Sequence, residues 1–377
     1  MWMYHIILIV CFLSAVFMER RNMAMIGVLS QEERIECSHK IEKKLFVILT
    51  IYMICLCGLR AYGKINHVGI DTYNYYHMYL EKEIWKFSDI FQQNVSDKGY
   101  FLLEWVLYTL KIDFWVLLFI SAMLYVGVLA IYIYRYSKNR WMSIFIFVAM
   151  GLYTFAFSAI RQGIAMGICI LAYMLMEKVK GVKGFLLFAL LIWIASTIHA
   201  SALIFFGAYF LQKIPFKPVT VFIFLGISTV TMLFKNQFAN LILQLAAETS
   251  EKYESYEVVQ NGGAGIMLYL FVLMTVVLRL LASGSMNEVA KKDNSVYLLL
   301  CMLILFPATQ TGGAMMRIYY YYYMFIVVYL PNVLESIDDF KTKQFGYLLL
   351  SLFLLWFYLS GDKVELDLVP YYFFWQV

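Results

Sequence analysis

Residues 115–134 read WVLLFISAMLYVGVLAIYIY, a run of twenty residues without a charge. A run of this length matches the hydrocarbon core of a bilayer, which a helix of about 20 apolar residues crosses. The rest of the chain has the same character, because 63% of its 377 residues are hydrophobic and only 15% are charged. Soluble domains average about 25% charged residues. The sequence therefore predicts an all-α polytopic membrane protein and argues against soluble enzymes, nucleic-acid binders and disulfide scaffolds.

The apolar runs on either side of this segment predict about twelve spanning helices in all. The predicted spans are 2–18, 45–59, 115–134, 142–159, 161–177, 184–199, 200–212, 218–234, 265–282, 295–310, 318–333 and 345–360. The run at 200–212 is short, and a re-entrant hairpin over 184–212 is the alternative there. Residues 99–111 are also apolar, but they contain Glu104, so we expect an interfacial helix on the outer face.

Six segments between the predicted spans are rich in Lys and Arg. They are 19–44, 135–141, 178–183, 213–217, 283–294 and 334–344, and they hold 18 of the 30 Lys and Arg residues. The positive-inside rule places them on the cytoplasmic side. Both termini then lie outside, together with two large outer segments, 60–114 and 235–263. We expect one integral membrane domain, 1–377, whose chemistry lies at its outer face.

The first candidate site follows the second predicted span, where residues 69–72 read Gly-Ile-Asp-Thr. A glycine allows a sharp turn at the membrane surface. The Asp71 carboxylate can accept a proton from a sugar hydroxyl, and tyrosine rings offer stacking surfaces. Asp71 is thus a candidate catalytic residue, and Arg60, Tyr73 and Tyr76 are candidate substrate-binding residues. The alternative is that Asp71 only caps a helix and the tyrosines form an interfacial belt.

The second candidate is Arg161 with Gln162, at the predicted outer start of a span. An arginine at membrane level is by default a functional hypothesis, and a helix N-terminus favours an anion such as pyrophosphate. The alternative is an arginine that extends to lipid headgroups. Gly163 and Gly167 form a GxxxG pattern, which predicts that this helix packs closely against another.

The third candidate is His199, which has apolar helical sequence on both sides. Histidine at such a position is either a proton-transfer group or a polar group satisfied between helices. We assign it to the candidate catalytic residues because it is predicted at the same outer level as Arg161.

The fourth candidate is Arg317, which follows a break at Gly312-Gly313 and opens a helix as Arg161 does. Arg317 with Tyr320 is a candidate phosphate site, and a membrane anchor is the alternative. The five consecutive tyrosines at 319–323 cover every face of a helix, so most must be packing or belt residues. Residues 370–375 are a further aromatic segment, expected to anchor at the interface or to cover the site.

The histidines and cysteines form no metal-ligand pattern, so we expect neither a metal nor another cofactor. The glycine-rich residues 261–265 lack the Lys-Ser/Thr pair of a phosphate-binding loop.

Taken in order, these motifs resemble the EpsG family of bacterial exopolysaccharide biosynthesis proteins, which is similar in role to Wzy-type polysaccharide polymerases. The resemblance is carried by Gly69-x-Asp71-Thr72 with Tyr76, Arg161-Gln162-x-x-Ala165, His199-x-Ser201, Arg317 ahead of Tyr320, and Pro370-Tyr371. The family often has Glu-Pro-Gly-Phe where this chain has Asp97-Lys98-Gly99-Tyr100.

The resemblance implies a glycosyltransferase-type polymerase of extracellular or capsular polysaccharide in the bacterial cytoplasmic (inner) membrane. The growing glycan would leave undecaprenyl pyrophosphate and join a lipid-linked repeat unit on the outer face. Asp71 or His199 would supply the base, with Asp71 preferred, and Arg161 and Arg317 would bind the pyrophosphate. The expected partners are the lipid-linked oligosaccharide, the bilayer, and flippase and chain-length regulator proteins, with no nucleic acid.

A lipid-linked oligosaccharide flippase or transporter is the main alternative from another class. Transporters place polar residues near the bilayer midplane, often with internal repeats, whereas the embedded charges here gather at one predicted face. A polysaccharide ligase or a membrane acyltransferase is a closer alternative, since a ligase shares nearly all of the required chemistry. An assembly scaffold without activity is the remaining one.

Overall fold

The computed structural model describes residues 2–24, 31–92, 97–247, 263–282, 295–310, 317–361 and 366–376. Over these ranges the chain is helical, with two isolated β-bridges and no β-strand. The all-α class is therefore confirmed. The predicted Gly312-Gly313 break and residues 248–262 of the second outer segment lie outside the described residues.

The chain divides into two compact units, and the first comprises Met1–Trp85, Leu103–Gly167 and Leu350–Val377. The helices of this unit are α1 (Trp2–Ala24), α2 (Gln31–Gly58), α3 (Thr72–Leu80), η1 (Glu81–Ile84), α6 (Phe114–Ala122), η2 (Met123–Gly127), α7 (Val128–Tyr136), α8 (Arg140–Ala149), α9 (Leu152–Ser158) and η7 (Phe374–Gln376). Three helices contribute residues to both units: α5 (Lys98–Thr109), α10 (Ile160–Lys178) and α20 (Phe340–Ser360).

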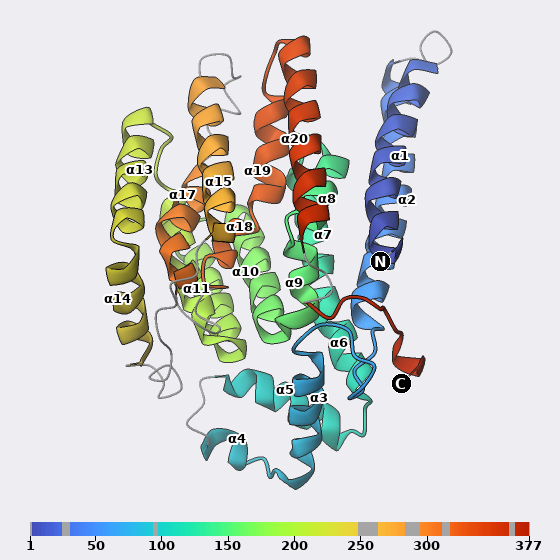
Figure 1. Cartoon of the computed structure of the whole chain (residues 1–377), viewed down its shortest axis with the longest axis vertical. Helices are drawn as coiled ribbons and strands as arrows, with labels where there is room; N and C mark the ends of the chain where they lie inside the picture. Colours follow the sequence, from blue (N-terminus) through green and yellow to red (C-terminus); the bar gives the residue numbers. More distant parts are fainter. Residues whose placement is uncertain are drawn as a thin grey trace. The chain divides into compact units, whose positions relative to one another are not determined.

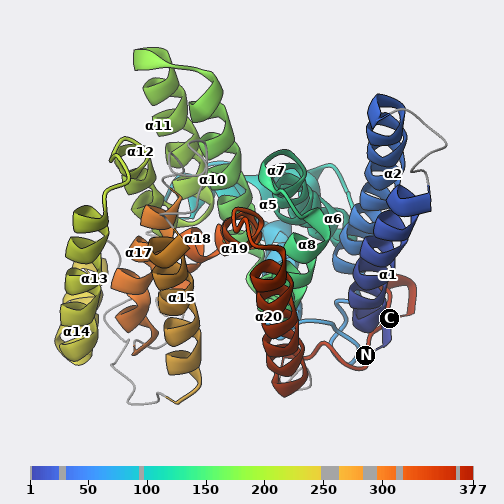
Figure 2. The same cartoon turned by 90° about the horizontal axis from the view of Figure 1, so that it is seen from above.

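The second unit comprises Lys86–Leu102 and Ile168–Leu349. Its helices are α4 (Asp89–Gln92), α11 (Gly181–Ile198), η3 (Ala200–Gly207), α12 (Ala208–Leu211), α13 (Pro218–Leu233), α14 (Lys235–Ala247), α15 (Gly263–Ala282), α17 (Val296–Leu305), η5 (Phe306–Gln310), α18 (Tyr320–Tyr323) and α19 (Ile326–Glu335). Within this unit α17 packs against both α13 and α15 (Figure 2).

Every predicted span overlaps a helix, but fewer helices pass a strict test of length and composition for crossing a membrane. Among the residues that the structure describes, four pass: Phe114–Tyr136, Ile160–Lys178, Gly181–Ile198 and Phe340–Ser360. Two bent pairs, α8 with α9 at 50° and α13 with Lys235–Leu245 at 90°, raise the number to six if each pair is one span. The helix α5, where we expected an interfacial segment, is not among these candidates. The count of twelve and the outer placement of the termini stay predictions.

Arg60, just past the end of α2, organises the first unit. Its side chain is 0% exposed. Its Nε donates to Val68 O (3.1 Å) and Thr72 Oγ1 (3.3 Å), and Nη2 donates to Phe157 O (3.0 Å). Its Nη1 donates to Cys57 O. Away from water every carbonyl needs a donor, and guanidinium supplies five in a rigid fork. Arg60 thereby ties the end of α2, the 60–72 loop and the end of α9 together.

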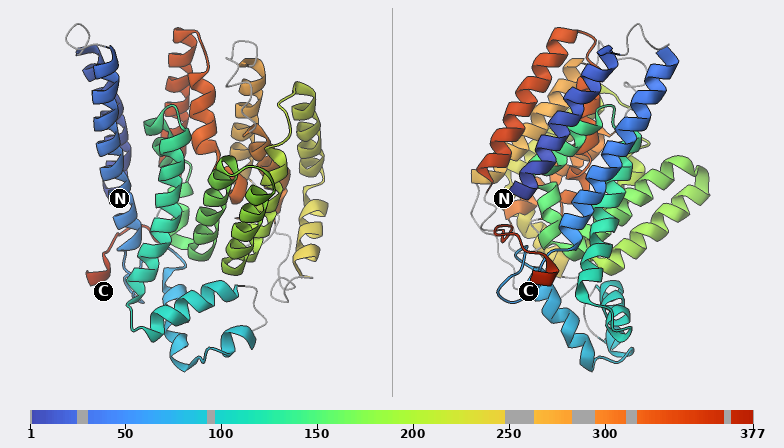
Figure 3. Two further views of the ribbon diagram at one scale, coloured as in Figure 1. Left: turned by 180° about the vertical axis from the view of Figure 1, so that it is seen from behind. Right: turned by 90° about the vertical axis from the view of Figure 1, so that its right-hand side faces the viewer.

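The C-terminal segment packs against the same loop. Ala61 N donates to Tyr372 O (2.9 Å), and Gly69 N donates to Asp367 O (2.8 Å). At the other end of the chain, Tyr4 OH donates to Leu368 O (3.3 Å), so the two termini of this unit lie near one another (Figure 3). Residues 372 and 373 therefore contact the start of the 60–72 loop, and both roles expected for the aromatic segment stay predictions.

The helices α1 and α2 run side by side in opposite directions (Figure 1). Tyr52, late in α2, donates its hydroxyl to Met3 O at the start of α1 (2.9 Å). This hydrogen bond joins α1 and α2 near the start of α1. The C-terminal segment contacts the same part of α1 through Tyr4.

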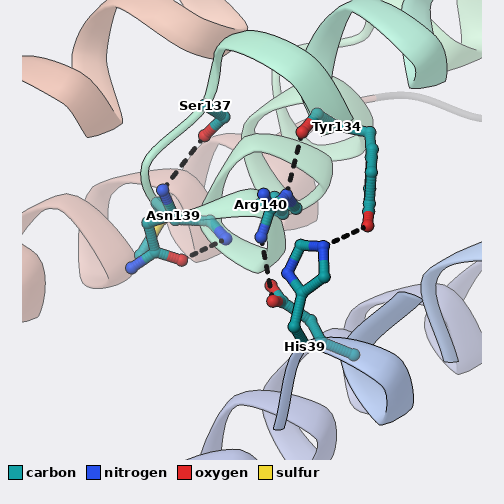
Figure 4. Close-up of polar contacts among 7 residues, drawn as sticks. His39, Tyr134, Ser137, Asn139 and Arg140 are labelled. Atoms are coloured by element: carbon teal, nitrogen blue, oxygen red, sulfur yellow. Dashed lines mark hydrogen bonds and ion pairs between the residues drawn. The ribbon is translucent and has the colours of Figure 1, made fainter. Parts of the chain in front are cut away.

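The turn between α7 and α8 is fastened to α2 by polar contacts (Figure 4). Arg140 Nη1 donates to Glu42 Oε2 (2.8 Å), and Tyr134 OH lies 3.1 Å from His39 Nε2. Asn139 Oδ1 accepts from Met142 N (3.1 Å) and caps α8. Arg140, His39 and Glu42 come from segments 19–44 and 135–141, which were predicted on the same side of the membrane, and the structure places these segments together.

The helix α11 folds back on η3 and α12 through a tight turn at His199. Phe185 near the start of α11 contacts Tyr209 in α12, with ring centroids 4.8 Å apart, and Phe188 contacts Phe206 (6.2 Å). Residues 181–211 thus form a helical hairpin, the geometry of the alternative considered for 184–212. Its depth in the membrane stays a prediction.

Replacing Arg60 with lysine tests its structural role. Lysine offers one nitrogen in place of the fork, so buried carbonyls lose their donors at about 1–3 kcal/mol each. We expect Arg60→Lys to lower the free energy of unfolding by about 3 kcal/mol, measured by thermal unfolding in detergent. Arg135→Lys, at an exposed position, is the matched control. An unchanged melting curve for Arg60→Lys would show that the network does not support the fold.

Candidate functional site

The turn at residues 69–72 is held against the end of α9. Gly69 has φ +95°, and a Cβ there would lie 2.3 Å from Phe157 O. The hydroxyl of Thr72 is 2.8 Å from Val68 O and 3.1 Å from Phe157 O. Only glycine fits such a backbone and such a close approach. In the Gly-x-Asp-Thr pattern, Gly69 and Thr72 therefore fix the backbone on either side of Asp71.

Asp71 occupies the N-cap position of α3 and is half-buried, but its side chain makes no cap hydrogen bond. The alternative that Asp71 only caps the helix therefore lacks its expected contact. One turn later, the ring of Tyr75 lies under the Arg161 guanidinium, 5.5 Å from centroid to Cζ. The first two predicted motifs thus meet within the first unit.

Tyr75 was not singled out by the sequence, because it lies off the three-residue spacing of its neighbours. Arg161 is half-buried in the first turn of α10, and Gln162 beside it is buried. A Cβ on Gly167 would lie 2.0 Å from Leu124 O in η2. The close packing predicted from the glycine pair is therefore confirmed, and it fixes the helix that carries Arg161.

Tyr73, Tyr76 and Tyr79 recur every three residues along α3, but they contact different neighbours. Tyr73 lies beside His67, with ring centroids 6.1 Å apart, whereas Tyr76 packs on Phe114 (5.4 Å). Tyr79 also packs on Phe114 (5.4 Å) and donates its hydroxyl to Ile112 O. Burial is the main cause that raises the pKa of Tyr79 to about 12, so its hydroxyl stays protonated. Tyr79 is thus a packing residue, and substrate contact by Tyr73 and Tyr76 stays a prediction.

In the second unit a buried carboxylate lies beside His199. Asp97 is 0% exposed and His199 is 6% exposed. Asp97 Oδ1 lies 3.9 Å from His199 Nδ1 and accepts a hydrogen bond from Ala200 N (3.3 Å). At 3.9 Å the carboxylate is beyond hydrogen-bond distance from the ring nitrogen, but its charge stabilises the imidazolium that forms on proton uptake. The arrangement suits a proton-transfer group.

The segment that carries Asp97 packs tightly on the end of α11. A Cβ on Gly99 would lie 2.3 Å from Thr197 Oγ1 and 3.1 Å from its backbone carbon. Sequence reasoning missed Asp97 because it gave weight to the departure from Glu-Pro-Gly-Phe. The available signal was that an acidic residue and the glycine are both kept in Asp97-Lys98-Gly99.

Arg317 is half-buried and lies just before α18. Two of the tyrosines that follow it reach the histidine turn, since Tyr321 OH accepts from Ser201 Oγ (3.2 Å) and Tyr322 OH donates to Ile204 O (2.7 Å). The third and fourth motifs therefore meet within the second unit. Tyr321, Tyr322 and Tyr323 are buried and act in packing, while Tyr320 is half-buried.

The predicted site residues thus fall into two groups. Asp71 and Arg161, with Arg60, Tyr73, Tyr76 and Gln162, belong to the first unit, and His199, Arg317 and Tyr320 belong to the second. The contacts of Arg60 with the protein's own carbonyls give it a structural role, and its contact with substrate stays a prediction. No three His, Cys, Asp or Glu side chains are clustered for a metal ion among the described residues.

Replacing Gly69 with alanine tests whether the 69–72 turn next to Asp71 is held rigidly. A Cβ at φ +95° next to Phe157 O must push the turn away, at a cost of about 1–3 kcal/mol. We expect Gly69→Ala to speed hydrogen exchange in residues 69–75, measured by mass spectrometry. Gly226→Ala in α13, where a Cβ meets nothing within 4 Å, should leave exchange unchanged. Equal exchange in both variants would contradict the close approach.

Comparison with known proteins gives a family. A model of the EpsG family matches residues 40–373, which is most of the chain. No curated protein and no solved structure matches.

Proposed function

Because the chain belongs to the EpsG family, we propose that it polymerises exopolysaccharide by moving a growing glycan from undecaprenyl pyrophosphate to a lipid-linked repeat unit. Membership of the family implies a polysaccharide polymerase-type role in exopolysaccharide biosynthesis. The apolar helices and the family make this a membrane protein. The lipid donor, the outer face of the bacterial cytoplasmic membrane and the residue roles below are our proposal.

In this reaction the bond between the anomeric carbon of the glycan and a pyrophosphate oxygen breaks. A hydroxyl oxygen of the acceptor unit bonds to that carbon, and its proton passes to a base. The lipid pyrophosphate leaves with the electron pair of the broken bond. Such a step needs a base of matched basicity and positive charge where the leaving group gains negative charge.

The observation that carries the proposal is the contact between Arg161 and Tyr75, one turn after Asp71 in the same short helix. The Gly69–Thr72 turn is fixed by buried contacts, and Tyr75 in the following helix lies under the Arg161 guanidinium. The helix that carries Asp71 and the helix that carries Arg161 therefore contact each other, and rigid support of this kind is how active sites keep productive geometry. Asp71 is assigned as the base, and Arg161 with Arg317 as the pyrophosphate partners.

His199 is assigned a second proton-transfer role, supported by the buried Asp97 carboxylate 3.9 Å from its ring. Asp97 is a positioning residue, because it acts on the reaction through the imidazole of His199. No cofactor is required if the arginines neutralise the leaving pyrophosphate.

Three substitutions test the assigned roles in cells. We expect Asp71→Asn, Arg161→Ala and Arg317→Ala each to abolish polymer at normal protein level. The first removes the base, and the other two each remove a positive charge that binds the leaving pyrophosphate. Single lipid-linked repeat units should accumulate, measured by mass spectrometry of extracted lipids. They should also be accessible to a lectin added outside spheroplasts.

Arg135→Ala, at an exposed position in the predicted cytoplasmic loop 135–141, is the matched control and should make normal polymer. Full-length polymer in all three test variants would overturn the site assignment. Lipid-linked units trapped inside the cell would indicate a flippase, and polymer made but left unattached would indicate a ligase.

A double-mutant cycle tests whether Asp97 acts through His199. Residues that act as a unit are strongly non-additive. We expect Asp97→Asn to lower the polymerisation rate by at least about tenfold, and Asp97→Asn with His199→Gln to be no slower than His199→Gln alone. Rates come from the time course of polymer in membrane vesicles. Independent, additive losses would show that Asp97 does not act through His199.

A further inference from the structure

The first unit contains a pocket of about 690 Å³ that the proposed chemistry does not use. Binding sites for small molecules commonly have volumes of about 300–1,000 Å³. The pocket is lined by residues 76–85 and 105–114, all of which belong to the first unit. Aromatic side chains and charged side chains make up most of its lining.

Four aromatic residues of the pocket keep part of their rings exposed. These are Tyr76, Trp85, Trp105 and Tyr108, each half-buried. An aromatic face offers an apolar surface of defined shape, and the indole N–H and the phenol O–H add polar edges. A pyranose ring has the matching features, with an apolar face of C–H groups and hydroxyls around its edge. The walls thus fit sugar rings better than a flexible lipid chain.

Each of the two tryptophans makes a polar contact that restricts its motion. Trp105 Nε1 donates to Trp85 O (3.1 Å). Lys82 Nζ lies 4.0 Å from the centroid of the Trp85 ring. Because both indoles are held before any ligand arrives, binding loses little side-chain entropy. Fixed rings of this kind are typical of a preformed site.

A buried ion pair holds Lys82 in the wall of the pocket. Its Nζ lies 3.2 Å from Glu104 Oε2, and the side chains are 1% and 0% exposed. The same nitrogen donates to Met78 O (2.9 Å). Burying two charges is expensive, so such a pair is weak evidence for added stability. Here the ion pair holds the Lys82 ammonium group over the Trp85 ring.

The charges that line the pocket balance. Lys82 and Lys111 are basic, and Glu83 and Asp113 are acidic. Asp113 Oδ1 accepts a hydrogen bond from Tyr62 OH (2.6 Å), and a carboxylate has room for about four such bonds. The balanced lining does not select an anion, which separates this pocket from a pyrophosphate site. Exposed Asp113 and Lys111 suit hydroxyl groups instead.

We propose that this pocket binds a short, uncharged stretch of glycan by stacking sugar rings on Trp85 and Trp105. The inference rests on the proposed function, in which the chain handles an oligosaccharide on a lipid carrier. The pocket supplies affinity for the sugar part, apart from the residues assigned to the reacting bond. Trp85 and Trp105 are therefore binding residues and not catalytic ones.

Saturation-transfer NMR on the full-length protein in detergent tests this directly. The probe is the free oligosaccharide of one repeat unit, released by mild acid from the lipid-linked units of the cell. We expect saturation to reach its ring C–H protons, and Trp105→Ala to weaken binding about tenfold. Trp105→Phe keeps an aromatic ring and should retain most of the affinity. Trp356→Ala, at an exposed position in α20, should bind as the parent protein does.

Size-exclusion profiles establish that each variant is folded. Absence of binding to the parent protein, or equal binding by folded Trp105→Ala, would overturn the pocket assignment. If the pocket test fails but cells with the parent protein still make polymer, only the pocket assignment is wrong and the proposed polymerase function is unaffected. Conversely, binding that is lost only in Trp105→Ala, by a protein that makes no polymer, would support the pocket and contradict the polymerase.

Discussion

The buried guanidinium of Arg60 is the interaction on which the first unit depends. It lies just past the end of α2, where the buried carbonyls of Cys57, Val68 and Phe157 need hydrogen-bond donors. One rigid fork supplies them. Arg60 contacts Thr72 and Phe157, the two residues that hold the Gly69–Thr72 turn, and α3 begins at this turn.

In the second unit, a turn that carries a predicted reactive residue is also held by buried polar contacts. His199 lies at the turn of the α11 hairpin, and Asp97, Ala200 and the tyrosines at 321 and 322 hold that turn in place. In both units a predicted reactive group is placed on a rigid turn by buried polar contacts. Rigid support of this kind is what catalysis by orientation and charge requires.

The sequence predicted the helical class and a helix at each apolar run, since hydrophobic length is a local property. It also predicted the close packing at Gly167, because a small-residue pattern is read along one helix. It could not predict partners brought together by the fold. Asp97 meets Ala200 across 103 positions, and Glu104, which counted only against a span, pairs with Lys82. Tyr75 carries no distinguishing pattern among its tyrosine neighbours. The Arg60 network was hidden because most of its acceptors are backbone carbonyls.

The most direct measurement is reconstitution of the purified chain in liposomes with undecaprenyl-pyrophosphate-linked repeat units as its sole substrate. Polymerisation by this chain predicts a ladder of lipid-linked glycans on gels, with one undecaprenyl pyrophosphate released for each bond formed. Folded protein that leaves the units single and releases no lipid pyrophosphate would contradict the assignment of this chain as the polymerase.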